Sequence, residues 1–139
     1  MFQRIIVAVD LSYTDISTRT LVAAANLARA TGAQIQLVYV RYIVDLAADY
    51  LTATTLQGDE KDVLEKLRAL AESCGLPAER VTVDSPIGRI YTEILAAAEK
   101  FDADLIVTGP HSPSMAKFLL GTDAASIVKH SPISVLVVR

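Results

Sequence analysis

Short apolar runs alternate with segments of helical periodicity along the whole chain. The first run, Arg4 to Asp10, is rich in β-branched residues and ends in a carboxylate, a pattern typical of a buried strand. Ser12 to Asp15 then offer hydroxyl and carboxylate caps for a helix whose apolar positions recur from Leu21 to Ala28 and stop at Gly32. The pattern predicts a strand followed by a helix.

The same alternation continues through the rest of the sequence. The predicted strands are Gln34 to Tyr39, Val81 to Val83, Leu105 to Thr108 and Ser134 to Val138, and the predicted helices are Asp59 to Cys74, Ile90 to Phe101 and Thr122 to His130. Five strands alternating with four helices predict an α/β fold, a doubly wound five-stranded parallel sheet with helices on both faces. No linker or internal repeat divides the chain, so residues 1–139 form a single predicted domain.

Composition narrows the class of protein. Of the 139 residues 52% are hydrophobic and 21% charged, which excludes a disordered chain. The net charge of -3 argues against a nucleic-acid partner, because phosphate binding needs basic surface. No apolar run is long enough to span a bilayer and no signal peptide precedes the first strand, so we expect a cytoplasmic protein with no membrane partner. Cys74 is the only cysteine, which excludes an internal disulfide and a multi-cysteine metal site.

The predicted topology indicates a ligand site independently of any sequence motif. Ligands of open α/β sheets bind beyond the carboxyl ends of the strands, where the strand order reverses. For the order 3-2-1-4-5 that point lies between Asp10 and Gly109, and for the order 2-1-3-4-5 it lies between Asp10 and Ser85. Two long connections, Arg41 to Gly58 and Pro110 to Gly121, are further candidates for function.

The residues at this point suit a nucleotide. Asp10 is placed to accept hydrogen bonds from ribose hydroxyls, or else it is a turn or cap residue. Gly109 and Gly121 allow close approach of backbone to phosphate, and Thr122 opens a helix whose N-terminus attracts anions; alternatively Gly121 is a loop glycine and Thr122 an N-cap. His111 also lies in this region. The chain has no Walker phosphate loop, no G-x-G-x-x-G after the first strand and no G-x-S-x-G elbow.

The chain resembles a single-domain universal stress protein, and the likeness runs from Ile5 to Val138. The ATP-binding class of that family carries G-x-x-G-x9-G-[ST] after the fourth strand. Here Gly109 is followed by Ser112 in place of the second glycine and, after a shorter spacer, by Gly121 and Thr122. This variant is similar to the F/G-type subgroup, in which S-H-R-P and L-L-G-S-N-A-A are typical.

The resemblance implies a Rossmann-like, adenine nucleotide alpha hydrolase-like fold with strand order 3-2-1-4-5, and ATP, ADP or AMP as the ligand, with or without Mg²⁺. It implies these roles by position: Asp10 to the ribose, the Val40 backbone to adenine, Ala8 along the base, and Gly109, Ser112, Gly121 and Thr122 around the phosphates. His111 is a further candidate for a place near the phosphates.

Asp123 departs from the family pattern. A carboxylate in the first turn of the last helix repels phosphate, at a cost of about one to a few kcal/mol at close range, unless a divalent cation bridges the two groups. The same carboxylate also stabilises a helix N-terminus. Asp123 is therefore either a residue of the nucleotide site or a helix-stabilising acid.

Three hypotheses for function follow. The leading one is an ATP-binding, nucleotide-responsive stress regulator without efficient catalysis, because no residue of the proposed site is an obvious general base with its own orienting partner. The second is an enzyme: a nucleotidyl or phosphoryl transferase that uses Asp123 and Mg²⁺ with Ser112 or Thr122 as acceptor, or else an enzyme that slowly hydrolyses ATP or phosphorylates itself. The third is a dimeric interaction module that binds no nucleotide.

The apolar strand Ser134 to Val138 bears on assembly. In the order 3-2-1-4-5 it lies at an unprotected sheet edge, and such edges invite pairing. We expect a homodimer in which this strand pairs antiparallel with its copy, as the resemblance also implies. The alternative is a monomer whose edge is covered by the Arg41 to Gly58 connection.

Overall fold

The structure, a computed structural model, describes residues 1–42, 60–110 and 122–139. Its elements in chain order are β1 (Arg4–Ala8), α1 (Thr14–Thr31), β2 (Gln34–Val38), β3 (Arg41–Tyr42), α3 (Glu60–Glu72), the 3-10 helix η1 (Ala78–Arg80), β4 (Val81–Asp84), β5 (Ile87–Gly88), α4 (Ile90–Phe101), β6 (Leu105–Thr108), α5 (Thr122–His130) and β7 (Ser134–Val137). Every strand and helix that the hydrophobic pattern predicts is present.

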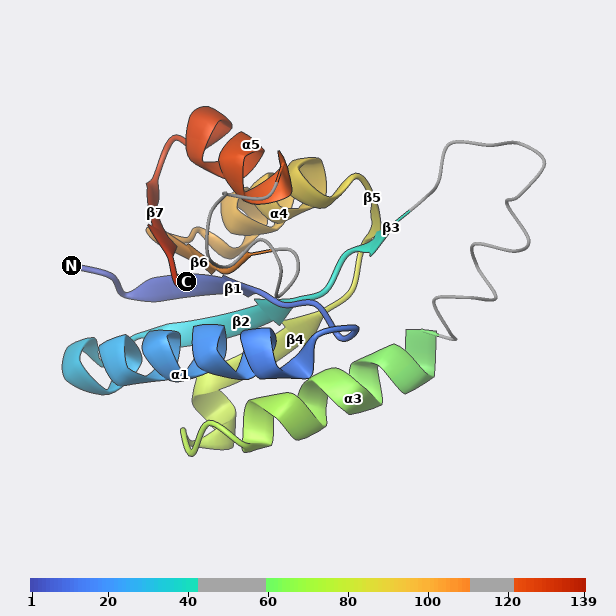
Figure 1. Ribbon diagram of the computed structural model, residues 1–139. Helices are drawn as coiled ribbons and strands as arrows, with labels where there is room; N and C mark the ends of the chain where they lie inside the picture. Colours follow the sequence, from blue (N-terminus) through green and yellow to red (C-terminus); the bar gives the residue numbers. More distant parts are fainter. Residues whose placement is uncertain (43–59, 111–121) are drawn as a thin grey trace.

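The main sheet has five strands in the order β4-β2-β1-β6-β7, and all neighbours are parallel (Figure 1). Counted within this sheet alone, the order is third, second, first, fourth, fifth, which is the 3-2-1-4-5 topology and excludes the order 2-1-3-4-5. The order reverses between β1 and β6, whose register pairs Ile5 with Leu105. The carboxyl ends of β1 and β6 therefore form the point at which a ligand is expected.

Helices cover both faces of the sheet, as predicted (Figure 1). On one face α1 and α3 bury small and branched residues, including Ala24 and Leu67, against the odd-numbered side chains of β1. On the other face α4 and α5 bury Ile94 and Ile127 against Ile6. The alternation of side chains along a strand thus supplies two separate apolar clusters, and both are closed by amphipathic helices.

The first strand and the first helix differ from prediction where they meet. The strand ends at Ala8 rather than Asp10, because the Asp10 N–H donates to the Ser17 hydroxyl (2.8 Å) and not to a neighbouring strand. The helix begins at Thr14 after Tyr13, and no side chain caps it, so the predicted hydroxyl and carboxylate caps are absent. The residues from Leu11 to Tyr13 instead make the turn that carries the chain from Asp10 into α1, closed by the Tyr13 N–H donating to the Asp10 carbonyl (3.1 Å).

The connection predicted over Arg41 to Gly58 begins with a strand. Arg41 and Tyr42 form β3, which pairs in parallel with β5 (Ile87–Gly88) in a small second sheet. The Arg41 guanidinium donates to the Ser85 carbonyl from Nε (3.2 Å) and Nη2 (2.8 Å), which holds the two strands together. The rest of this connection, and of the one from Pro110 to Gly121, lies outside the described residues.

The amino ends of the strands are tied together by charged side chains. The Asp104 carboxylate accepts from the backbone N–H groups of Gln3 (2.8 Å) and Arg4 (3.1 Å). The Arg4 guanidinium lies over the Phe101 ring at 4.1 Å from its centroid and donates to the Gln34 side chain (2.9 Å). These groups satisfy one another within the protein at the edge opposite the strand-order reversal.

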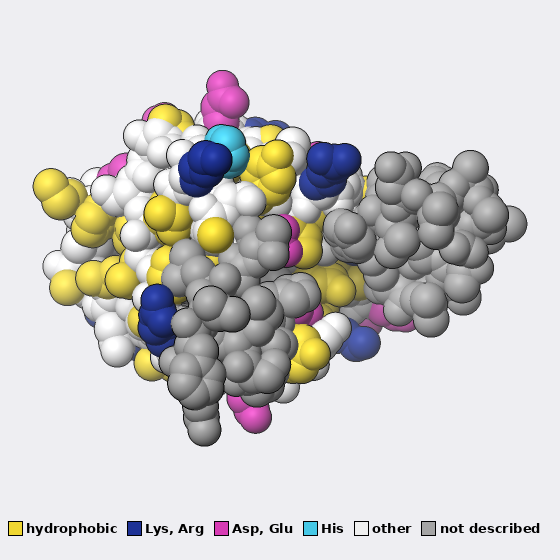
Figure 2. All heavy atoms as spheres, turned by 45° about the horizontal axis from the view of Figure 1, so that its top comes forward, with side chains coloured by type: hydrophobic (Ala, Val, Ile, Leu, Met, Phe, Trp, Pro, Cys, Tyr) yellow, Lys and Arg dark blue, Asp and Glu magenta, His cyan; other side chains and the backbone are white. Residues whose placement is uncertain are grey.

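Surface features agree with a globular α/β domain. On the face shown in Figure 2, the Lys, Arg, Asp and Glu side chains of the described residues are interspersed with hydrophobic ones. Among the residues that the structure describes, no helix is long and apolar enough to cross a membrane. Cys74 is buried just after α3, as expected for a small apolar side chain at a helix end.

Candidate functional site

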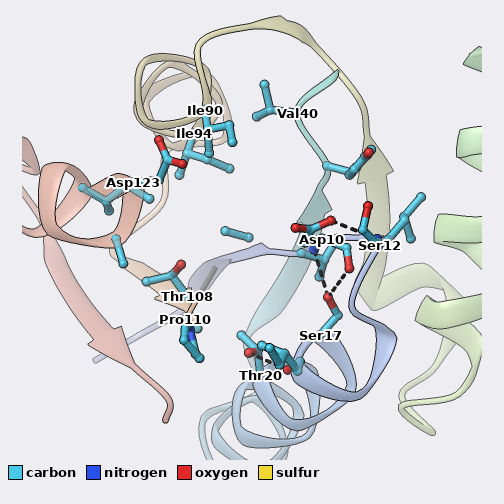
Figure 3. Close-up of a pocket in the computed structure, with 18 of the residues that line it drawn as sticks. Asp10, Ser12, Ser17, Thr20, Val40, Ile90, Ile94, Thr108, Pro110 and Asp123 are labelled. Atoms are coloured by element: carbon cyan, nitrogen blue, oxygen red, sulfur yellow. Dashed lines mark hydrogen bonds between the residues drawn. The ribbon is translucent and has the colours of Figure 1, made fainter. Parts of the chain in front are cut away.

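A cavity of about 720 Å³ opens at the carboxyl ends of β1, β2 and β6, where the strand order reverses (Figure 3). Its walls come from these strand ends, from the start of α1, and from α3, α4 and α5. The volume lies within the range of small-molecule sites. The topology-based prediction of a site at this edge therefore coincides with a hollow in the structure.

Asp10 is held in the wall of this cavity by its neighbours. One carboxylate oxygen, Oδ1, accepts from the Ser12 N–H (2.9 Å). The buried Ser17 hydroxyl accepts from the Asp10 N–H (2.8 Å) and donates to the Asp10 carbonyl (2.8 Å). Figure 3 shows the carboxylate facing the open space. Fixed in this way, Asp10 offers an acceptor for hydroxyl groups of a ligand.

Tyr39 lines the same part of the cavity. Burial and the charge of the Asp10 carboxylate raise the pKa of the Tyr39 phenol above its ordinary value of 10.0. The phenol is therefore protonated at neutral pH and can donate a hydrogen bond. The sequence pattern gave Tyr39 only as the last residue of a strand, and its distance from Asp10 in the chain offered no signal of this proximity.

An apolar wall stands opposite Asp10. Ala8 is the last residue of β1, Val40 lies between β2 and β3, and Ile90 and Ile94 project from α4 into the cavity (Figure 3). Such a wall suits a flat, weakly polar group such as a purine base. Ala8 and Val40 are predicted site residues, whereas the helical periodicity identified Ile90 and Ile94 only as core positions.

Gly109 follows β6 and lines the cavity, but its missing side chain also serves packing. A Cβ atom there would lie 2.7 Å from Thr20 Oγ1 and 3.2 Å from Ile16 Cγ2, both on α1. Thr20 is 1% exposed and its hydroxyl donates to the Ile16 carbonyl (2.9 Å), so it has little freedom to move. The prediction assigned this glycine to ligand approach alone, while the structure shows that contact with α1 requires it.

Asp123, the second residue of α5, lines the cavity on the side of α4. Figure 3 shows its carboxylate next to Ile94 and Ile90, across the cavity from Asp10. Within the described ranges, no group of three or more His, Cys, Asp or Glu side chains is arranged to hold a metal ion. Asp123 is thus both a first-turn acid of α5 and a charged group of the cavity.

The predicted site residues divide into three groups. Ala8, Asp10, Val40, Gly109 and Asp123 all line one cavity. Thr122 is the first residue of α5, as predicted. His111, Ser112 and Gly121 lie outside the described residues.

The sequence patterns did not identify several other residues that line the cavity. Lys66 on α3 and the buried hydroxyls of Ser17, Thr20 and Thr108 also line the cavity. None of them belongs to a motif, and only the three-residue spacing of Lys66 from the apolar position Val63 hinted that it shares a helix face with the core.

Comparisons with known proteins come from sequence and from structure. The sequence model of the Universal stress protein family matches residues 1–139. Universal stress protein G of Shigella flexneri is 27% identical over 142 residues, covering 100% of this chain and 100% of that protein.

Two solved structures share the fold. One is a universal stress protein in complex with cAMP, with a TM-score of 0.73 and 22% identity over 99% of this chain and 97% of that one. The other is the universal stress protein from Archaeoglobus fulgidus in complex with dAMP, with a TM-score of 0.63 and 18% identity over 99% and 98%. The family match spans every residue, and the chain belongs to the universal stress protein family, as its resemblance in sequence predicts.

Proposed function

We propose that this protein binds an adenine nucleotide in the cavity at the β1–β6 switch and acts as a nucleotide-responsive regulator. The observation that carries the proposal is the pairing of a fixed carboxylate with an apolar wall in one hollow: Asp10 faces the space and Ile90 and Ile94 line its other side. The base packs on the wall, the ribose hydroxyls donate to Asp10, and the phosphates extend toward Gly109 and the start of α5.

The comparisons support the chemical class of the ligand. Two proteins of the same fold are described in complex with cAMP and with dAMP, both adenine nucleotides. Neither ligand is a triphosphate, and we extend the proposal to ATP, ADP and AMP because Gly109 and the N-terminus of α5 border the cavity and favour phosphate. Mg²⁺ next to Asp123 would offset the repulsion between that carboxylate and a polyphosphate.

The proposed regulator is not an efficient enzyme. The Asp10 carboxylate accepts from a backbone N–H and has no nucleophile hydrogen-bonded to it among the described residues. The Ser17 hydroxyl is engaged with the Asp10 backbone on both sides and is not free to act as an acceptor of phosphate. We therefore expect ATP hydrolysis or self-phosphorylation to be slow.

Thermal unfolding with and without ligand tests the proposal. A ligand at about 100 times its Kd stabilises the native state by about 2.7 kcal/mol, so ATP, ADP or AMP raises Tm, each measured with and without Mg²⁺. GTP serves as the control for the base. No stabilisation by any adenine nucleotide would favour the interaction module that binds no nucleotide, and turnover well above the uncatalysed rate would favour the enzyme.

The proposed assembly is a homodimer through β7. Among the strands of the described residues, β7 lies at the edge of the sheet with β6 as its one neighbour, and its Leu136 side chain is 38% exposed. Antiparallel pairing with a second β7 across a two-fold axis would satisfy the open edge. Sedimentation at micromolar concentration should give a dimer mass; a single monomer species independent of concentration would refute the pairing.

A further inference from the structure

The cavity reaches a positively charged residue that the base and the ribose do not need. Lys66 lies in the middle of α3, one turn after Val63, and both residues line the cavity. Val63 is 4% exposed, whereas Lys66 is an exposed position. An exposed residue that still lines the cavity stands at its rim, where a long aliphatic stem can follow the apolar helix face and leave the ammonium in water.

The fold puts this lysine on the opposite side of the sheet from Asp123. α3 packs with α1 in one apolar cluster, through Val63 and Leu67, and α5 packs in the other, through Ile127. In Figure 3 the turn with Asp10 and Ser12 is on the side of α3, and Asp123 is on the far side of the cavity. Lys66 is thus the charged group of the wall that adjoins the β1–α1 turn.

The charges along the cavity need a positive group if an anion is to bind. Asp10 and Asp123 both contribute carboxylates to the lining, and Lys66 is the one cation among the described lining residues. The ion pair found among the described residues joins Arg41 to Glu60 (3.8 Å), so Lys66 is not paired with a carboxylate in that part of the chain. As a lining residue, Lys66 brings a positive charge to the cavity.

Resting on the proposed nucleotide site, we propose that the charge of Lys66 attracts the ligand phosphates across the cavity and makes the cavity select charged nucleotides over the uncharged nucleoside. Lys66 supplies this charge from α3, a helix separate from the β6–α5 connection to which the phosphate contacts are assigned. Its effect is electrostatic, so it grows with the charge of the ligand and weakens with salt. Adenosine, with the same base and ribose, gains nothing from it.

The test compares two ligands on matched variants. We measure binding of ATP and of adenosine, without divalent cations and at low salt, to the wild-type chain, to Lys66→Met and to Lys61→Met. Lys61 is exposed on the same helix and does not line the cavity. Lys66→Met should weaken ATP binding about threefold to tenfold and change adenosine binding by less than about twofold. Lys61→Met should change neither.

Two further measurements sharpen the result. Lys66→Arg keeps the charge and should keep most of the ATP affinity, and raising the salt should shrink the difference between wild type and Lys66→Met. Equal losses for ATP and adenosine, or no loss for either, would overturn the role of Lys66 while leaving the nucleotide site standing. A wild-type chain that binds neither ligand would overturn the proposed function itself, and the role of Lys66 with it.

Discussion

Polar side chains at the amino ends of the parallel strands differ from those at the carboxyl ends in what they contact. At the amino ends, the Arg4 guanidinium donates to the Phe101 carbonyl, the Arg80 guanidinium donates to the Ala33 carbonyl, and the Asp104 carboxylate accepts from backbone N–H groups. At the carboxyl ends, Asp10 and Lys66 face a cavity of about 720 Å³. The first edge satisfies its hydrogen-bonding groups internally, and the second leaves some of them open to a ligand.

This difference separates stability from binding within one sheet. A group that is fully satisfied inside the protein stabilises the fold and has nothing to offer a ligand. A group that faces open space contributes less to folding and can exchange water for ligand atoms. Substitutions at the amino ends should therefore change the free energy of unfolding, and substitutions at the carboxyl ends should change affinity for nucleotide.

The largest expected effect is at Arg80. Its guanidinium donates to the Ala33 carbonyl from Nε (3.1 Å) and Nη2 (2.8 Å), and also to the Ala28 carbonyl. Arg80→Ala removes these charge-assisted bonds and should lower the free energy of unfolding by about 2–3 kcal/mol in urea titrations. Arg68→Ala, an exposed position of α3, is the control. Changes in nucleotide affinity with unchanged stability would reverse the assignment of the two edges.

Gly109→Ala should lower stability although Gly109 lies at the carboxyl ends of the strands. The added Cβ meets Thr20 on α1, so we expect a loss of about 1–3 kcal/mol in unfolding free energy from overpacking. Combining it with Thr20→Ala removes the atom at 2.7 Å and should cost less than the sum of the single changes. Additive losses would show that the contact with α1 is not the reason for the glycine.

Asp10→Ala should weaken adenine nucleotide binding about tenfold, because the ribose hydroxyls lose their acceptor. The matched control is Asp15→Ala, since Asp15 is exposed in the first turn of α1 and does not line the cavity. Calorimetric titration of both variants with AMP measures the difference. Equal affinities for the two variants would remove Asp10 from the proposed site.

Asp104→Asn should show a smaller, pH-dependent effect. Burial acts to raise the pKa of the Asp104 carboxyl, but hydrogen bonds from the Gln3 and Arg4 N–H groups outweigh it and lower that pKa below 3.8. A lowered pKa in the folded state means that the stabilisation is present at neutral pH and is lost as the pH falls through the folded-state value. Urea unfolding should show a gap between variant and wild type at pH 7 that closes in acid. A gap that does not change with pH would contradict this account.

The smallest expected change is at Asp123. Removing its charge with Asp123→Asn should leave metal-free ATP binding unchanged or tighten it up to about threefold, because a like charge leaves the cavity wall. Adding Mg²⁺ should reduce the difference between the variant and wild type. Markedly weaker binding by Asp123→Asn without metal would mean that the carboxylate accepts a hydrogen bond from the ligand.

The fold was predictable because short strands with apolar residues alternate regularly with longer helices of clear periodicity. The strands β1, β6 and β7 are largely apolar runs, β2 and β4 carry apolar residues among polar ones, and the crossovers carry helical stripes such as Val63, Leu67 and Ala71, so the connection rules leave few topologies. The small sheet of β3 and β5 was not predictable, since a strand of two residues has no period to detect. It depends on the Arg41 side chain, whose partner Ser85 is far away in the chain.

Site residues were predictable where their place at the end of a strand brings them to the cavity. They were not predictable where the direction of the side chain decides whether it reaches the cavity. Asp10 follows from the end of the central strand, whichever strand order is assumed. Lys66 and Tyr39 reach the same cavity from a helix face and a strand end, and one residue of rotation in either would turn them away. The role of Thr20 against Gly109 required the distance between two elements, which no local pattern contains.

The central place of β1 has a consequence for synthesis. One partner strand, β2, is synthesised soon after β1. The partner on the other side, β6, which pairs Leu105 with Ile5, is synthesised about a hundred residues later. At a translation rate of about 5–20 residues per second, roughly a hundred residues take about 5–20 s. For that time one side of the most apolar strand lacks its final neighbour, and closing so long a segment is entropically slow. The nascent chain is then most exposed to aggregation, before the ligand cavity that this strand helps to form exists.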